Sequence, residues 1–208
     1  MTCRSPIPAA ALAVAAALFS TAQPAAAQDH PQLRPSRDVM VEYHILNVHP
    51  GDHRSDTVRM FFADDGMKMR IEPAGQPGYS IVDRRTHRML LVMVPQHMFM
   101  EVAYDPSHIM DFDATDATFR RLGPDTVAGI ACTNYEVERQ GRHGQACLTR
   151  DGVLLRARSE NAGQPGGGME AVSVAYGPQP AALFAPPPDY RKMDMTTMGH
   201  GMTPPPSK

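Results

Sequence analysis

The sequence predicts a mainly β protein of the α+β kind: a curved antiparallel sheet with one or two short helices. Apolar and polar residues alternate over short runs such as Val39–Leu46, and this period of two is typical of a strand with one buried face. Asp, Gly and Pro cluster in the gaps between the runs, and these residues favour tight turns. Because many short strands follow one another closely, we expect a meander in which most strands pair with their neighbours along the chain.

The first 27 residues have the three parts of a cleavable export signal. Arg4 is the positive start, residues 7–19 are apolar, and Ala25, Ala26 and Ala27 form a small-residue cleavage site. The apolar run is about 13 residues long, whereas a helix needs roughly 20 residues to span a bilayer. We therefore expect cleavage after Ala27 and a periplasmic mature protein without a transmembrane segment.

Composition divides the chain into four expected segments. They are a signal peptide at 1–27, a flexible N-terminal arm at 28–37, a curved β domain at 38–192 and a disordered Met-, His- and Pro-rich tail at 193–208. The whole chain has 20 Lys and Arg against 22 Asp and Glu, and the signal carries only Arg4, so the mature chain has 19 against 22. A net charge of −3 argues against binding to nucleic acid, which requires a basic surface.

Six strands are expected in the first half of the β domain. Val58, Met60 and Phe62 alternate with other residues, and the Asp-Asp-Gly sequence at 64–66 is a hairpin signal. Turn residues at 73–78 break the pattern again. The expected strands are 39–46, 58–62, 67–72, 79–83, 88–94 and 97–103.

One helix is expected between the two halves of the domain, at 105–121. Asp111 or Asp113 would cap its N-terminus, and the loose spacing of Ile109, Phe112 and Phe119 is compatible with one short helix. We expect this helix to cover one face of the sheet.

The strand pattern returns in the second half of the domain. It begins near position 126, continues at 142–150 and 153–158 around an Asp-Gly turn signal, and ends with a strand at 172–176.

Two cysteines remain after the signal, Cys132 and Cys147, and an exported chain with two cysteines is expected to form one disulfide. A four-residue loop at 138–141 would place the two cysteines directly opposite each other, on the face away from Tyr135 and Val137. Two free thiols and a redox-active pair are the alternatives, although no Cys-x-x-Cys motif supports the second.

Two segments carry a family resemblance. Residues 126–137 resemble the T-x-A-G-x-x-C-x-x-Y-x-V segment of DUF4412, an exported family known only as a domain of unknown function. Residues 184–190 are similar to its closing F-x-x-P-x-G-Y segment, with Asp189 where the family usually has Gly. The resemblance covers roughly residues 38–195.

This family looks like a distant relative of the LolA/LolB-like periplasmic lipoprotein carriers. The resemblance implies a half-barrel with an apolar concave face, and the carriers bind acyl chains in that concavity. The pattern contains no catalytic residues, and a fold resemblance alone is a weak basis for assigning function.

Methionine is unusually abundant in the expected strands, and the sequence holds 15 Met and no Trp. Methionine is flexible and polarisable, so it adapts to ligands of variable shape. The alternation predicts one inward-facing apolar cavity, whereas the alternative is an ordinary core filled with Met. The predicted cavity residues are Met60, Phe62, Met69, Ile71, Met89, Leu91, Met93, Met98 and Met100.

The tail carries a second candidate site, formed by Met193, Met195, Met198, His200 and Met202. Thioethers are soft ligands that select Cu(I), and imidazole can complete such a site. The alternative is a disordered tail that binds no metal.

No catalytic motif occurs in the sequence: Gly-x-Ser-x-Gly, His-Glu-x-x-His and a phosphate-binding glycine loop are all absent. The sequence therefore predicts a periplasmic, non-enzymatic binding protein without a cofactor. Its expected ligand is an acyl chain, a lipoprotein or a hydrophobic partner segment. The alternatives are a Cu(I)-binding protein that uses the tail and an envelope-interaction module without a small ligand, and the oligomeric state is not predicted.

Overall fold

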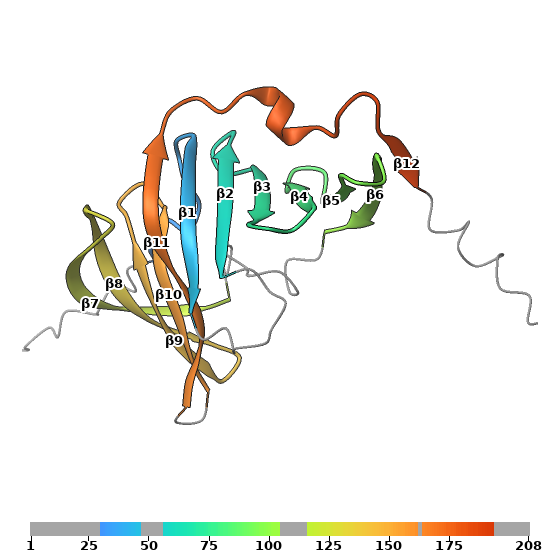
Figure 1. The fold of residues 1–208 in the computed structure, drawn as a ribbon. Helices are drawn as coiled ribbons and strands as arrows, with labels where there is room; N and C mark the ends of the chain where they lie inside the picture. Colours follow the sequence, from blue (N-terminus) through green and yellow to red (C-terminus); the bar gives the residue numbers. More distant parts are fainter. Residues whose placement is uncertain (1–29, 47–55, 105–115, 162–163, 194–208) are drawn as a thin grey trace, which may run out of the picture.

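The computed structural model describes residues 30–46, 56–104, 116–161 and 164–193, which form one large, curved, open sheet (Figure 1). Twelve strands in these ranges are arranged in the order β12-β6-β5-β4-β3-β2-β1-β11-β10-β9-β8-β7. The strands are β1 (Val39–Leu46), β2 (Thr57–Ala63), β3 (Lys68–Pro73), β4 (Gly78–Asp83), β5 (Arg88–Met93), β6 (Met98–Ala103), β7 (Thr118–Val127), β8 (Ile130–Arg139), β9 (Arg142–Leu148), β10 (Leu154–Asn161), β11 (Gln164–Tyr176) and β12 (Arg191–Met193).

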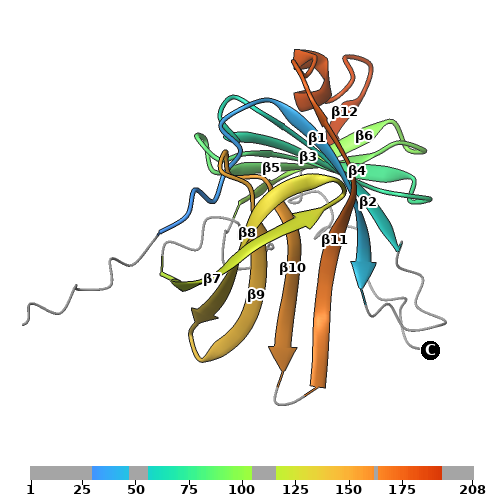
Figure 2. The same ribbon diagram turned by 90° about the vertical axis from the view of Figure 1, so that its left-hand side faces the viewer.

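Two antiparallel meanders make up the sheet. Strands β1 to β6 form the first, β7 to β11 form the second, and the antiparallel pair of β1 and β11 joins them. Figure 2 shows the second meander in the foreground, with the first fanning out behind it. Only β12 is parallel to its neighbour, β6, among the strands of the described ranges. The predicted fold class, a curved antiparallel sheet, is confirmed.

Turn residues explain where the hairpins fold back. Asp64, Asp65 and Gly66 have φ values of 58°, 53° and 71°, the left-handed region that Asp and Gly tolerate best. The β7–β8 turn uses Ala128 and Gly129, again with positive φ at both positions, as a two-residue hairpin turn of type I′ requires.

The predicted helix at 105–121 is wrong where the structure describes it. Residues from Thr118 onward belong to β7, and Phe119 pairs with Val137 of β8. Positions 105–115, which include both predicted caps, lie outside the described residues. The helix that the described residues do contain is the four-residue 3-10 helix η1 (Ala181–Phe184).

The predicted disulfide is confirmed, but the predicted register is wrong by two residues. Cys132 and Cys147 are bonded, with a Cα–Cα distance of 5.6 Å. The turn is the two-residue pair Gln140 and Gly141, both with positive φ, so Cys147 lies opposite Asn134 and the bridge joins diagonal positions. A two-residue turn of type I′ matches the twist of the flanking strands better than the four-residue loop that we expected.

The segment before β1 packs against the second meander. Leu33 contacts the small cluster formed by Ala117 and Phe119, and Arg37 pairs with Asp151 at 2.7 Å. The backbone of Ser36 donates a hydrogen bond to the carbonyl of Asp151 at 2.9 Å. The expected signal peptide and positions 194–208 of the expected tail lie outside the described residues.

Candidate functional site

Cross-strand register places all nine predicted cavity residues on one face of the first meander, which we call the apolar face. One row of paired positions runs across the strands through Val41, Met60, Ile71, Ser80, Leu91, Met100 and Met193. A second row contains Val39, Phe62, Met69, Val82, Met89 and Val102. A third, shorter row contains Gly78, Met93, Met98 and Arg191. Side chains at paired positions point to the same side of a sheet, so these residues form one continuous surface.

Burial changes along the apolar face. Near β1, Met60, Phe62 and Met69 are core residues with exposures of 1%, 3% and 0%. Ile71 and Met89 pack against this core and are partly buried. The remaining predicted residues are half-buried, namely Leu91, Met93, Met98 and Met100. The predicted set therefore contains two groups. One lies in the core or packs against it, and the other consists of half-buried residues, mostly methionines, in β5 and β6.

Charge separates the two faces of this meander. Ten charged residues lie in β1 to β6 and β12, and nine of them point away from the apolar face: Glu42, Arg59, Lys68, Arg70, Glu72, Asp83, Arg88, Glu101 and Lys192. Several form ion pairs on that opposite face. Arg70 and Glu72 are 2.6 Å apart within β3, and Glu101 of β6 pairs across strands with Arg88 at 3.0 Å and Lys192 at 2.7 Å.

The opposite face also carries the segment between β11 and β12. Arg70 stacks over the ring of Tyr79 at 3.5 Å and donates a hydrogen bond to the carbonyl of Leu183 in η1 at 3.0 Å. The backbone of Gln179 donates to the Asp38 carboxylate at 3.1 Å. This segment therefore reaches β12 by crossing the charged face of the sheet (Figure 1).

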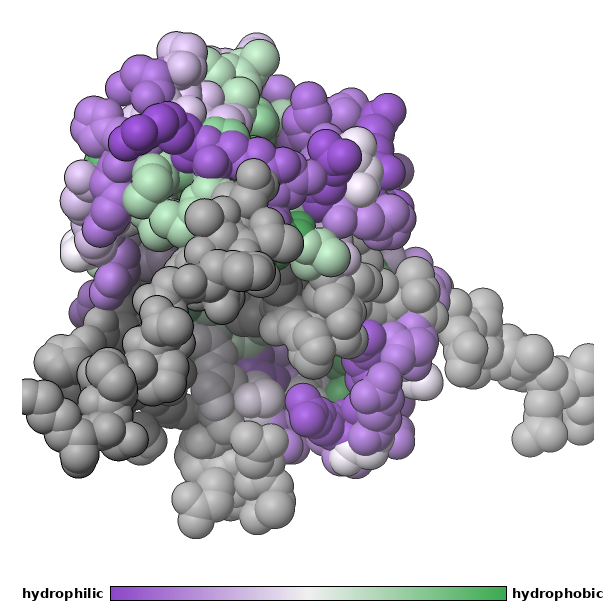
Figure 3. All heavy atoms as spheres, turned by 90° about the vertical axis from the view of Figure 1, so that its right-hand side faces the viewer, coloured by the Kyte–Doolittle hydropathy of each residue, from purple (hydrophilic) through white to green (hydrophobic). Residues whose placement is uncertain are grey.

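Seen from the β6–β12 end of the sheet, the coloured surface is mostly hydrophilic, with apolar residues in small separate groups (Figure 3). Four large apolar residues among those described are exposed: Val94, Leu122, Val172 and Tyr176. Val172 and Tyr176 lie in β11, Leu122 lies in β7 and Val94 follows β5, so the four are divided among three parts of the sheet.

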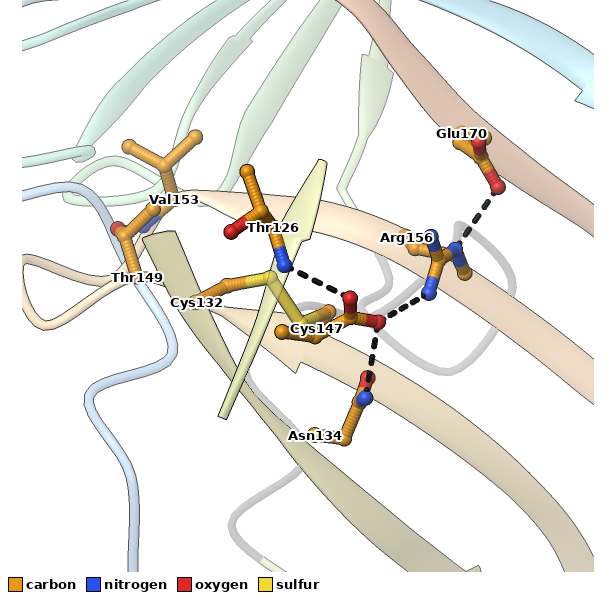
Figure 4. Close-up of a disulfide and its surroundings, with 9 residues drawn as sticks. Thr126, Cys132, Asn134, Cys147, Thr149, Val153, Arg156 and Glu170 are labelled. Atoms are coloured by element: carbon orange, nitrogen blue, oxygen red, sulfur yellow. Dashed lines mark hydrogen bonds and ion pairs between the residues drawn. A yellow bond between two sulfur atoms is a disulfide. The ribbon is translucent and has the colours of Figure 1, made fainter. Parts of the chain in front are cut away.

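A polar network surrounds the disulfide in the second meander (Figure 4). Asp125 of β7 accepts hydrogen bonds from Asn134 at 3.0 Å, from Arg156 at 2.7 Å and from the Thr126 backbone at 2.7 Å. These bonds, with that from Asn134 the largest cause, lower the pKa of Asp125 to about 2.

Arg156 extends the network by donating to Glu170 of β11 at 2.8 Å, and this bond is the main cause of the lowered pKa of Glu170. Burial opposes the charge of Arg156, but its hydrogen bonds to Glu170 and Asp125 outweigh that effect and raise its pKa. The network ties β7 to β11, so we assign it a structural role. Sequence reasoning missed it because its residues are far apart in the chain.

Tyr43 lies in the core at β1, where the two meanders join. It is fully buried, and its hydroxyl donates to the carbonyl of Leu154 at 2.8 Å. Burial is the largest cause of its raised pKa. This hydroxyl is a satisfied structural group rather than an acid positioned for catalysis.

Of the predicted metal ligands, Met193 alone lies within the described part of the chain. It is half-buried in β12, opposite Met100 of β6. Met195, Met198, His200 and Met202 lie outside that part. The described residues contain no group of three His, Cys, Asp or Glu side chains that could hold a metal ion. In the same ranges, no helix is long and apolar enough to cross a membrane.

The sequence profile of DUF4412, a domain of unknown function, matches residues 46–157, which is more than half of the chain. The chain belongs to this family. This match confirms the resemblance seen in the sequence. A search of curated proteins finds none that matches this chain.

Comparison with solved structures shows the fold of this DUF4412 protein. MucB in complex with MucA(peri) is similar over 79% of this chain and 59% of the MucB chain, with a TM-score of 0.51 and 18% identity. The MucA/MucB complex of Pseudomonas aeruginosa gives a TM-score of 0.50 and 16% identity, over 74% of this chain and 57% of that one. The chain thus spans less than two thirds of the MucB chains. MucB has a LolA-like fold, and at these identities the likeness shows the fold alone.

Proposed function

We propose that this protein is a periplasmic binding protein without catalytic activity, which holds an apolar ligand against the accessible end of the apolar face. The ligand is an acyl chain, free or attached to a lipoprotein, or a hydrophobic segment of a partner. One observation carries the proposal: half-buried methionines gather at β5, β6 and β12, beyond the fully buried core.

Methionine side chains suit this task because they repack at little cost around ligands of different shape. Each methylene removed from water contributes about 0.8 kcal/mol, so about ten methylenes give roughly 8 kcal/mol before the costs of association. A partly covered apolar surface is therefore sufficient for useful affinity.

Two further observations support the proposal. MucB, which shares the fold, has been solved in complex with MucA(peri), so at least one protein with this fold binds a partner. The disulfide is of the kind that forms and persists in an oxidising compartment such as the periplasm.

The test is lipid extraction and mass spectrometry of the mature protein purified from periplasm, followed by titration with a fluorescent acyl probe. We expect co-purified lipid and saturable probe binding. Met98→Gln and Met100→Gln should weaken binding, because each places a polar group on the apolar face. Met40→Gln is the matched control, since Met40 is a half-buried methionine on the opposite face.

The proposal fails if the protein carries no lipid and binds no acyl probe. It also fails if Met40→Gln weakens binding as much as the two substitutions on the apolar face, because the loss would then reflect general destabilisation.

As a second candidate, we propose Cu(I) binding by the C-terminal segment. Met193 lies opposite Met100, so one methionine of the predicted set is paired with a methionine of the sheet, and thioethers are ligands that select Cu(I). Titration with Cu(I) against a competing chelator should show tight binding by the full mature chain and its loss on deleting 194–208. If deletion leaves Cu(I) uptake unchanged, the tail plays no part.

A further inference from the structure

We propose that the ligand is an amphiphile with an anionic head, and that Arg191 binds the head while the half-buried methionines hold the apolar chain. This inference rests on the proposed function above and specifies its ligand class. It starts from the one charged side chain that the apolar face carries among the described strands.

Backbone pairing determines where Arg191 points. Strand β12 runs parallel to β6, with Arg191 opposite Met98 and Met193 opposite Met100. The backbone of Arg191 donates to the carbonyl of His97 at 3.0 Å, which fixes the start of the strand. Arg191 therefore lies on the same side of the sheet as the methionines, and its side chain is exposed.

The neighbouring cation behaves differently. Lys192 points to the opposite face, where it pairs with Glu101 at 2.7 Å. Among the residues that the structure describes, no carboxylate is within ion-pair distance of Arg191. A planar guanidinium in this position can bind a carboxylate or phosphate through two parallel hydrogen bonds.

The row of paired positions that begins at Arg191 is charged at one end and apolar along the rest, as an amphiphile is. It continues through Met98 and Met93 and ends at Gly78, which adds no side chain. Three inter-strand spacings separate the ends of this row, or about 14 Å. An extended alkyl chain of medium length spans that distance, with its head at Arg191 and its methyl end over β4.

Charge selects the head group. The single charge on an otherwise uncharged face is positive, so it attracts an anionic head and repels a cationic one. Exposure of the guanidinium keeps this preference moderate, and we expect a factor of about ten in the dissociation constant.

The experiment compares amphiphiles with one alkyl chain and different heads, each below its micelle concentration, on the mature full-length protein. Dodecanoate and dodecyl phosphate represent fatty-acid and phospholipid heads, dodecanol is the neutral probe, and dodecyltrimethylammonium is the cationic one. We expect at least one anionic probe to bind about tenfold more tightly than dodecanol, and the cationic probe to bind most weakly. The stronger of the two anionic probes identifies the source of the head group.

Arg191→Gln should remove the preference for the anionic head while leaving dodecanol binding unchanged. Arg142→Gln is the matched control: Arg142 is exposed, lies in β9 and has no ion-pair partner among the described residues, so the net charge changes equally. Far-UV circular dichroism confirms that each variant folds.

Each outcome has a distinct meaning. Equal binding of anionic and neutral probes by the unsubstituted protein overturns the inference but leaves the proposed function intact. A preference that survives in Arg191→Gln, or that is also lost in Arg142→Gln, overturns the assignment to Arg191. Failure of every probe to bind removes the proposed function itself.

Discussion

Met69→Ala and Met98→Ala should separate the core methionines from the accessible ones. Met69 is 0% exposed and lies within the main hydrophobic cluster, so its truncation removes buried apolar surface and leaves a cavity. Such substitutions cost about 2–5 kcal/mol of unfolding free energy. Met98 is half-buried in β6, next to the edge strand β12, and solvent can fill the space it leaves, so we expect a cost of about 1 kcal/mol.

Urea unfolding followed by far-UV circular dichroism measures both effects, since the chain has no Trp to report by fluorescence. With an m-value of roughly 2 kcal/mol per M, the midpoint should fall by at least about 1 M for Met69→Ala and by no more than about 0.5 M for Met98→Ala. Acyl-probe binding should show the reverse ranking once both variants are confirmed to be folded.

Equal losses of stability would refute this reasoning. They would mean that Met98 is packed as tightly as Met69, so that the accessible end of the apolar face is already filled. Met40→Ala, at a half-buried methionine of the opposite face, gives the loss expected for partial burial without a role in binding.

Three further predictions concern the scaffold. Replacing both cysteines, as Cys132→Ala with Cys147→Ala, should lower the unfolding free energy by about 3 kcal/mol in urea titrations, because the bridge spans a sequence separation of 15. The pKa of Asp125 is about 2 in the fold, below roughly 3.9 in an unfolded chain, so its contribution to stability is complete above about pH 5 and is lost as the pH falls through about 2. Asp125→Asn should therefore flatten that part of the curve of stability against pH, and an unchanged curve would exclude this role. Gly152→Ala should lower the unfolding free energy by about 3 kcal/mol, measured by thermal unfolding. The reason is that φ at Gly152 is +86° and an added Cβ would clash with the carbonyl of Arg34.

Period-two alternation was sufficient to predict the apolar face. Every second residue of a strand lies on one side, so Met60 and Met69 could be assigned to a shared face without knowing which strands pair. The hairpin turns then fix the register between successive strands. This part of the fold depends on local sequence, and all nine predicted residues do share one face.

Features that depend on distant pairing could not be predicted. The register of β8 and β9 was missed because Gln140 and Gly141 suit a two-residue turn as well as part of a longer loop. The strand around Phe119 was read as helix because apolar residues there are sparse. Whether a methionine is core or accessible depends on how the sheet curves, which alternation does not encode.

Arg191 shows most clearly where sequence reasoning ends. It precedes a Met-rich tail, and only its pairing with Met98 in β6 puts its charge on the apolar face. That placement gives opposite expectations for the two proposed ligands. A positive charge beside Met193 should weaken binding of Cu(I) and strengthen binding of an anionic amphiphile. Arg191→Gln should therefore raise affinity for Cu(I) if Met193 takes part in a metal site, and lower affinity for dodecanoate or dodecyl phosphate if the face holds an amphiphile. One variant measured with both probes thus decides between the two ligand classes, since a single substitution changes the two affinities in opposite directions.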